Sequence, residues 1–342
     1  MTSEPNLLDE STAEQIANEL KTLRNEITNV IFGQEKLIDL VMVAMLARGH
    51  LLLEGLPGLG KTELVKAFSK ALQIKTNRVQ FTPDLLPGDI TGNPMLQEID
   101  GSRKFIFEQG PVFTNLLLAD EINRASPKTQ SALLEAMQEK RVTVMGETHS
   151  LPSPFFVFAT QNPIELEGTY PLPEAQLDRF LFKLEVTHSD VDTLERIITN
   201  RPLGEEPTVN AVLDGPRLSE LSAMSQRVFL PDVVGRYIAR LVHATSPGNS
   251  KAAEGLRYGA SPRAAIGLAA ASRAKALLEG RAHASCDDVQ AIAQPILGHR
   301  IIVSYQARMR GQSSAEVVAS LLEEVPLEEQ ALPQSLTAAK IS

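Results

Sequence analysis

The residues of this chain with the clearest chemical potential lie in a glycine-rich stretch that ends in a lysine and a threonine. In order, they are Gly55, Leu56, Pro57, Gly58, Leu59, Gly60, Lys61 and Thr62. An apolar run at residues 51–53 precedes this stretch and predicts a buried strand, and the residues after it show helical periodicity. Between a strand and a helix, such a loop points backbone N–H groups at phosphate oxygens. Lys61 suits the charge of a triphosphate, and the Thr62 hydroxyl suits Mg²⁺.

Two adjacent carboxylates, Asp120 and Glu121, follow a second apolar run at residues 116–119. In an open α/β sheet, ligands bind beyond the carboxyl ends of the strands, so both side chains should lie near the glycine-rich loop. There, Asp120 would hold Mg²⁺, directly or through water, and Glu121 would orient and deprotonate an attacking water molecule. An acidic pair alone is also common on protein surfaces, but its place after an apolar strand predicts hydrolysis of the triphosphate.

Three further side chains could act on the same triphosphate. Asn162 follows a third apolar run, and its amide could hold the attacking water by donating and accepting at once, although asparagine before proline is also a common turn. Arg263 stands in the first turn of a predicted helix, where a bound phosphate would offset its unfavourable place in the helix dipole; solvent exposure is the alternative. Arg179 could stabilise charge on the terminal phosphate, or it could pair with Asp178 or Glu174.

The elements that must position these residues alternate along the first half of the chain. Apolar runs that predict parallel strands, at residues 51–53, 116–119 and 155–158, alternate with amphipathic helical patterns. This alternation predicts an α/β fold, with a doubly wound parallel sheet sandwiched by helices. Two segments, near residues 95–107 and 141–151, are typical of β-hairpins, because the first has an Asp-Gly turn pair and the second a glycine turn.

The second half of the chain is predicted to be helical. The composition shifts near residues 187–207, where prolines, glycine and acidic residues indicate a connection between domains. We therefore expect an α/β nucleotide-binding domain with an N-terminal helix at residues 1–190, a linker at 191–207 and an all-α domain at 208–342. Helical periodicity is clearest at 216–228, 231–244, 262–279 and 286–297. Residues 312–342 are predicted to be partly helical, with no packing assigned to them.

The composition is typical of a globular protein that is large enough for two domains. The chain has 342 residues, a formal net charge of −9 and one cysteine, Cys286. The negative charge argues against a nucleic-acid surface, which needs clustered lysine and arginine. A single cysteine excludes an internal disulfide and fits a reducing compartment. Because no apolar run reaches about 18 residues and the N-terminus lacks a signal-peptide layout, we expect a cytoplasmic protein without a membrane span.

Several sequence blocks occur in order within about residues 10–310. Besides the glycine-rich loop, they are Gln80-Phe81-Thr82-Pro83-Asp84-Leu85-Leu86-Pro87, Asp120-Glu121-Ile122-Asn123-Arg124-Ala125, Ala159-Thr160-Gln161-Asn162-Pro163, Pro173-Glu174-Ala175-Gln176-Leu177-Asp178-Arg179-Phe180 and Ala260-Ser261-Pro262-Arg263-Ala264. Together and in this order, these blocks resemble the MoxR family of AAA+ ATPases.

The resemblance implies a P-loop AAA+ fold, with ATP and Mg²⁺ as ligands, and a role for each site residue. The glycine-rich loop is the Walker A loop, and Asp120 with Glu121 forms the Walker B pair. Asn162 corresponds to sensor 1. Arg263 corresponds to sensor 2, which reaches the γ-phosphate from a helical lid domain.

The resemblance also implies partners. Arg179 resembles an arginine finger, which acts on ATP held by the neighbouring subunit and so implies a homo-oligomer, usually a hexameric ring. In related proteins the two hairpins face the central pore. Proteins of this family are chaperone-like, and they typically work with a von Willebrand factor A domain protein on a client protein complex. The sequence does not identify the client.

Two other functions remain open on the sequence alone. A nucleic-acid motor is one, since related AAA+ proteins with such hairpins act on DNA. The basic residues of the hairpins are Arg103, Lys104 and Arg141, which have acidic neighbours and no aromatic residues interleaved for base stacking. The other is an ATP-gated adaptor with little turnover. Because Glu121 and Asn162 are both present, the sequence favours hydrolysis over that alternative.

Overall fold

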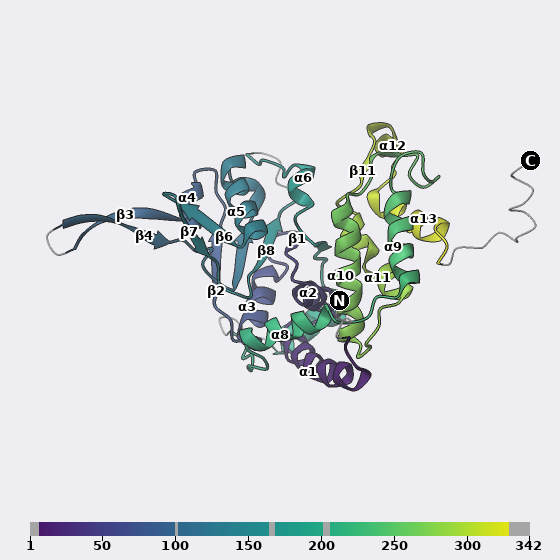
Figure 1. Cartoon of the computed structure of the whole chain (residues 1–342), viewed down its shortest axis with the longest axis horizontal. Coiled ribbons are helices and arrows are strands. Elements are labelled where there is room, and N and C mark those ends of the chain that lie inside the picture. The colour runs from purple at the N-terminus through teal and green to yellow at the C-terminus, as the bar shows by residue number, and fades with distance from the viewer. Residues whose placement is uncertain (1–6, 100–101, 164–167, 201–205, 328–342) are drawn as a thin grey trace, which may run out of the picture.

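A parallel sheet of five strands, in the order β2-β5-β8-β1-β9, forms the centre of the first half of the molecule. The computed structural model describes residues 7–99, 102–163, 168–200 and 206–327. The strands of this sheet are β1 (Leu51–Glu54), β2 (Thr76–Gln80), β5 (Leu116–Asp120), β8 (Phe156–Gln161) and β9 (Phe182–Glu185). The predicted parallel sheet is therefore confirmed, and Figure 1 shows it beside the lid helices.

Helices cover both faces of this sheet. One face packs on α1 (Glu10–Thr28), α2 (Glu35–Leu46) and α3 (Lys61–Ala71), and the other on α5 (Pro127–Glu139), with α4 (Pro87–Thr91) and the short helix η1 (Ile122–Arg124) nearby. Successive side chains of a strand point to opposite faces. Accordingly, Leu51 and Leu53 join the first core cluster, and Leu52 joins the second. Because both faces of the sheet are buried, successive residues of its inner strands are apolar rather than alternating with polar ones.

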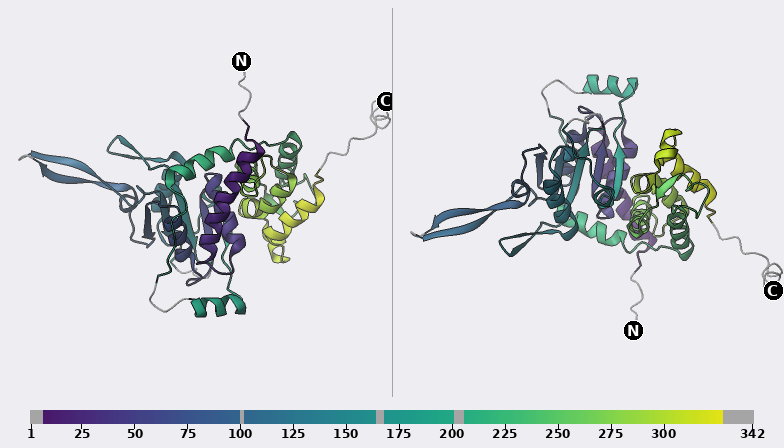
Figure 2. Two further views of the ribbon diagram at one scale, coloured as in Figure 1. Left: turned by 90° about the horizontal axis from the view of Figure 1, so that it is seen from below. Right: turned by 90° about the horizontal axis from the view of Figure 1, so that it is seen from above.

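Both predicted hairpins are confirmed, and both lie outside the five-stranded sheet. The first pairs β3 (Gly92–Ile99) with β4 (Ser102–Gln109), and the second pairs β6 (Arg141–Val144) with β7 (Glu147–Ser150). The predicted turn at Asp100 and Gly101 lies outside the described residues. Figures 1 and 2 show that the β3–β4 ribbon projects from the body on the side opposite the lid helices.

The second half of the molecule contains the four predicted helices, now with defined neighbours. They are α8 (Gly215–Ser225), α9 (Asp232–Ala244), α10 (Pro262–Leu278) and α11 (Cys286–Leu297), followed by α12 (Tyr305–Met309) and α13 (Ser314–Glu324), which packs on α9 and α11. The lid is not entirely helical, because β10 (Leu256–Tyr258) and β11 (Ile302–Val303) form an antiparallel pair. In the described part of the chain, no helix is long and apolar enough to cross a membrane.

Two further helices lie near the end of the sheet domain in sequence. Helix α6 (Glu174–Leu177) precedes β9, and α7 (Val191–Asn200) lies within the segment predicted as a linker. Helix α7 packs back on the first half of the chain, because Thr193 contacts Gly33 and the Arg196 guanidinium lies 4.8 Å from the centroid of the Phe32 ring. Part of the predicted connection is therefore an ordered helix beside the sheet domain.

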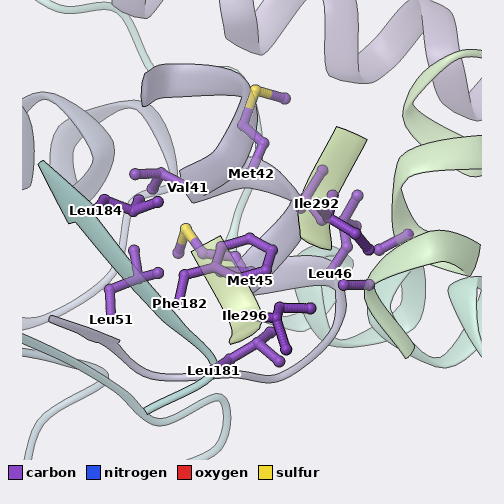
Figure 3. Packing of buried hydrophobic residues seen from close by; sticks show 14 of the residues in the cluster. Val41, Met42, Met45, Leu46, Leu51, Leu181, Phe182, Leu184, Ile292 and Ile296 are labelled. Carbon is purple, nitrogen blue, oxygen red and sulfur yellow. The ribbon is translucent and has the colours of Figure 1, made fainter. Parts of the chain in front are cut away.

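One continuous apolar core joins the lid to the sheet. Figure 3 shows Met45 and Leu46 of α2 packed among Phe182 of β9 and Ile292 and Ile296 of α11. None of these five side chains is more than 2% exposed. Burying a side chain of this size stabilises the folded state by roughly 1.5–3 kcal/mol. The lid is thus held against its own sheet by the hydrophobic effect.

His50, the residue before β1, links two elements of the sheet domain and gives a prediction about pH. Its Nδ1 accepts from the Val157 N–H at 3.0 Å, and its Nε2 donates to the Met137 carbonyl at 3.2 Å. Burial lowers the pKa of His50 from 6.5 to about 4. The unfolded state therefore binds a proton that the folded state does not. We expect the free energy of unfolding to fall as pH drops through this window, by up to about 1.4 kcal/mol per pH unit.

Urea unfolding at about pH 7 and about pH 5 measures this effect. The His50→Gln variant should show a weaker pH dependence than the unmodified protein. The matched control is His243→Gln, because His243 is exposed and its replacement should leave the pH dependence unchanged. An equal pH dependence in His50→Gln would assign the effect to other groups.

Candidate active site

The strand register brings the predicted site residues to one edge of the sheet. Gln80 of β2 lies beside Asp120 of β5, and Leu53 of β1 lies beside Thr160 of β8. Because these strands are parallel, their carboxyl ends and the loop that follows β1 meet there. A cavity of about 360 Å³ opens at this edge. Its lining residues are Pro57, Gly58, Gly60, Lys61, Thr62, Glu63, Arg78, Gln80, Asp120, Glu121, Thr160 and Asn162.

Five of the predicted chemical groups therefore share one cavity: Lys61, Thr62, Asp120, Glu121 and Asn162. The remaining loop residues lie close by. The Lys61 ammonium donates to the carbonyls of Gly55 and Leu56, and Leu59 lines an adjoining cavity. Burial lowers the pKa of Lys61, while the negative charges of Asp120 and Glu121 oppose this shift.

The backbone of the loop requires its glycines. Gly58 and Gly60 have φ values of 84° and 82°, in the left-handed region that side chains disfavour. At Gly55, a Cβ atom would lie 2.8 Å from the Val186 carbonyl oxygen, so a larger residue would displace the loop from β9. Helix α3 begins at Lys61, directly at the cavity. Its first N–H groups and the positive end of its dipole suit an anion.

Asp120 is oriented by hydrogen bonds to both carboxylate oxygens. Its Oδ1 accepts from the Thr160 hydroxyl at 2.6 Å, and its Oδ2 accepts from the Arg78 guanidinium at 2.7 Å. The same Thr160 oxygen accepts from the backbone N–H of Glu121 at 2.9 Å. Thr160 therefore fixes the position of both carboxylate residues relative to β8.

Glu121 has a strained backbone and a held side chain. Its φ of 56° and ψ of 50° lie in the left-handed region, a conformation that costs a non-glycine residue roughly 1–3 kcal/mol and is frequent at functional sites. Its Oε2 accepts from the Gln80 amide and from the Arg124 guanidinium, each at 2.9 Å. These donors point the carboxylate into the cavity rather than toward bulk solvent.

Sequence reasoning gave no role to Gln80, Thr160 or Arg78. Gln80 and Thr160 stood in the sequence blocks that resembled the family, yet their function depends on which strands are neighbours. The order β2-β5-β8 places both beside Asp120, and this order is not encoded in any local pattern. Arg78 lies two residues before Gln80 on β2, so both side chains lie on the same face of that strand. Once Gln80 was placed at the cavity, strand alternation would have predicted that Arg78 lies there too.

A second, more apolar cavity adjoins the first at Gly58 and Gly60. It has a volume of about 420 Å³. Its lining residues are Val30, Ile31, Phe32, Gln34, Gly58, Leu59, Gly60, Glu63, His188, Ser189, Leu194 and Ile197. An apolar hollow next to a phosphate-binding loop has the shape and chemistry for a nucleotide base. Leu194 and Ile197 belong to α7, whose helical spacing of apolar residues could have predicted this wall.

The two predicted arginines lie together, at a different place. Arg179 Nη1 donates to the Leu134 carbonyl at 2.7 Å, and Arg263 Nη2 donates to the Gln138 amide oxygen at 3.2 Å. Leu134 and Gln138 are one turn apart on α5. Both arginines are within the described residues, and neither lines the cavity that contains Lys61. Arg263 was expected to reach the γ-phosphate from the lid, but in this structure it donates to Gln138 of α5, the helix that also accepts from Arg179.

Arg179 borders a hollow of about 560 Å³ on this other face. Its lining residues are Ser131, Leu134, Glu135, Glu139, Arg141, Thr143, Thr148, Gln176 and Arg179. Asp178, which sequence reasoning offered as an ion-pair partner for Arg179, pairs instead with Arg300 at 2.8 Å. Arg179 is therefore not held by Asp178, and it borders this hollow.

A parallel sheet with a glycine-rich loop between β1 and a helix, a carboxylate pair at the end of β5 and a helical lid defines a P-loop ATPase of the AAA type. In the sheet, β8 lies between β1 and β5. Comparisons agree. The profile described as "ATPase family associated with various cellular activities (AAA)" matches residues 50–182, and that of the AAA lid domain matches residues 249–321.

Chaperone MoxR1 of Mycobacterium tuberculosis is 42% identical over 329 residues, which cover 94% of this chain and 85% of that protein. Protein MoxR of Paracoccus denitrificans is 33% identical, over 81% of this chain and 87% of that protein. A crystal structure of a candidate ATPase from Cytophaga hutchinsonii superimposes with a TM-score of 0.85, at 38% identity, over 94% of this chain and 98% of the other. The chain belongs to the MoxR family of AAA+ ATPases.

Proposed function

We propose that this chain hydrolyses ATP with Mg²⁺ in a ring-shaped homo-oligomer and uses the reaction to remodel protein partners. The observation that carries the proposal is the division of the predicted hydrolytic residues. Lys61, Thr62, Asp120, Glu121 and Asn162 line one cavity, whereas the two arginines lie on another face. A complete set then requires a second subunit.

The nucleotide is held by the loop and by the start of α3. Backbone N–H groups of the loop and the Lys61 ammonium bind the β- and γ-phosphates, and the apolar hollow lined by Phe32 and Leu194 receives the base. The oxygens of Thr62 and Asp120 fit Mg²⁺, which usually binds one or two protein oxygens together with phosphates. When bound, Mg²⁺ would neutralise phosphate charge. Asp120 is oriented for this by the Thr160 hydroxyl.

Hydrolysis depends on Glu121 and Asn162. The Glu121 carboxylate accepts a proton from the attacking water, and the Asn162 amide orients that water toward the γ-phosphate. Gln80 and Arg124 hold the carboxylate by hydrogen bonds. Both donors bind Oε2, so Oε1 is the oxygen that accepts the proton from water.

Arg179 supplies positive charge to the γ-phosphate of the neighbouring subunit. Its contact with Leu134 of α5, away from its own Lys61, supports an action in trans. Arg263 shares that face, so we extend the proposal and assign Arg263 to the same neighbouring nucleotide. Each nucleotide would thus contact two subunits, and a hexameric ring is the arrangement that the family resemblance implies.

The surface of the β3–β4 ribbon favours a protein over a nucleic acid as the partner. Leu96 and Phe105 lie opposite each other and are 53% and 64% exposed. The basic residue Arg103 lies opposite Glu98, which offsets its charge. Exposed apolar side chains suit a polypeptide, whereas a DNA surface needs unpaired cations. As the family resemblance implies, we propose a von Willebrand factor A domain protein and its client complex as partners, and cytoplasmic action.

The Lys61→Ala variant tests nucleotide binding. Lys61 is the cation nearest the phosphates, and loss of such a charged hydrogen bond removes about 2–3 kcal/mol of binding free energy, roughly a 30- to 150-fold weaker Kd. Titration with a fluorescent ATP analogue measures the Kd, and phosphate release with and without Mg²⁺ measures turnover. Both signals should be strongly reduced in the variant.

The matched control is Lys66→Ala. Lys66 lies on the same helix, about one turn further on, and pairs with Glu206 at 2.7 Å outside the cavity. Its replacement should leave the Kd within about twofold, because the charge of an exposed pair contributes little. If Lys61→Ala bound ATP as tightly as Lys66→Ala, the assignment of the cavity to a triphosphate would be wrong.

A further inference from the structure

A buried arginine of the lid, Arg300, forms hydrogen bonds to the segment that contains Arg179. Its side chain is only 4% exposed. The guanidinium Nε donates to the Asp178 carboxylate at 2.8 Å, Nη2 donates to the carbonyls of Asp178 and Phe180 at 3.2 and 2.6 Å, and Nη1 donates to the Leu181 carbonyl at 3.0 Å. Four of its hydrogen bonds therefore reach the residues that flank Arg179.

The fifth hydrogen bond ties the same guanidinium to the lid. Nη1 also donates to the Ile296 carbonyl of α11 at 2.6 Å, so all five N–H donors of the guanidinium have acceptors. This set explains how a charge can be buried there, since a buried cation must be paired and hydrogen-bonded. A lysine could not replace it, because an ammonium has three donors on a single atom.

Two residues near Arg300 add further hydrogen bonds between the lid and this segment. The ring of His299 donates from Nε2 to the Phe180 carbonyl at 3.2 Å, and Ser261, at the start of α10, donates to the Asp178 carboxylate at 2.9 Å. Burial lowers the pKa of His299 to about 3, so the ring is neutral at physiological pH. Residues of α10 and of the turn after α11 thus converge on the same short segment.

We propose that Arg300 is a positioning residue for Arg179. It fixes the backbone on both sides of Arg179, and thereby sets the direction in which the Arg179 side chain points. The lid of one subunit then controls hydrolysis in its neighbour rather than in its own nucleotide cavity. This inference rests on the proposed action of Arg179 in trans.

A double-mutant cycle tests the inference. Arg300→Lys should keep the Kd for ATP and lower kcat roughly tenfold to hundredfold, because a shift of about 1 Å in a catalytic group has effects of that size. In the Arg179→Ala background, Arg300→Lys should lower kcat by less than about twofold, since it has no guanidinium left to position. Independent, multiplicative losses would overturn the proposal.

The control is Arg281→Lys. Arg281 is also a partly buried lid arginine with a carboxylate partner, Asp288 at 2.6 Å, but its hydrogen bonds go to Glu279, His283 and Asp288, within the lid. We expect its kcat to remain within about twofold of the unmodified protein. Asp178→Asn provides a second variant in case Arg300→Lys folds poorly, because it leaves Arg300 in place and removes only the ion pair. It should show the same non-additivity with Arg179→Ala.

Mixed assemblies separate this inference from the proposed function. Arg300→Lys mixed with Glu121→Gln should regain activity, because the Glu121→Gln subunit supplies a correctly held Arg179 to the intact neighbouring cavity. If Arg179→Ala regains activity in such a mixture and Arg300→Lys does not, this inference is wrong and the action of Arg179 in trans stands. If neither mixture recovers, the action in trans is wrong, and the positioning role is lost with it.

Discussion

Replacing Glu121 by glutamine should leave ATP binding intact and slow hydrolysis by roughly 10²–10⁴-fold, the contribution of a well-placed general base. Glutamine has nearly the same shape and can still accept hydrogen bonds from Gln80 and Arg124. It cannot take a proton from water. Phosphate release at saturating ATP gives kcat, and titration with a fluorescent ATP analogue gives the Kd.

Glu63→Gln is the matched control for this experiment. Glu63 also lines the cavity, but it belongs to the first turn of α3 and lies near the Lys66 ammonium, at 3.4 Å. Its replacement should change kcat by no more than a few-fold, as expected for a surface pair. An unchanged kcat in Glu121→Gln would show that the base is misassigned. An unmodified protein as slow as Glu121→Gln would favour the ATP-gated adaptor.

The second large effect concerns the boundary between subunits. Arg179→Ala should bind ATP normally and lose roughly 10³-fold or more in kcat, the scale of known arginine fingers. When it is mixed with an equal amount of Glu121→Gln, about one quarter of the nucleotide sites should combine an intact Glu121 with an intact Arg179 of the neighbour. Activity should then return to about a quarter of the normal rate, although each variant alone is nearly inactive.

The mixture must be shown to contain mixed assemblies, which mass photometry of differently tagged subunits can establish. Arg141→Ala is the control, because Arg141 lines the same hollow as Arg179 but pairs with Glu139 at 3.3 Å. Its loss should reduce kcat far less. Failure of the mixed assembly to recover would place the action of Arg179 within its own subunit.

Much of the fold could be predicted from local patterns. The apolar strands are buried on both faces, so their composition identifies them, and Ser126 followed by Pro127 marks the start of α5 by cap and first-turn preferences. The β10–β11 pair was missed because its strands have three and two residues, too few to show alternation. Helix α7 was missed because nearby prolines and glycine dominated the composition of that segment.

The candidate site was predictable where a residue's role follows from its place at a strand end. Asp120 and Glu121 met that condition, as did the loop after β1. Gln80 and Thr160 required the order of the strands, which arises from long-range packing. The position of Arg263 required the docking of the lid, because α11 packs against β9 and brings the start of α10 toward α5.

The apolar contacts of Met45, Phe182 and Ile296 have a mechanical consequence. Opening a hinge between the two halves of a protomer would expose these side chains to water, at roughly 1.5–3 kcal/mol each. The sheet and the lid of one protomer would therefore move together as a rigid unit. In the proposed ring, the movements driven by hydrolysis would then occur at the boundaries between subunits, where the nucleotides are proposed to bind.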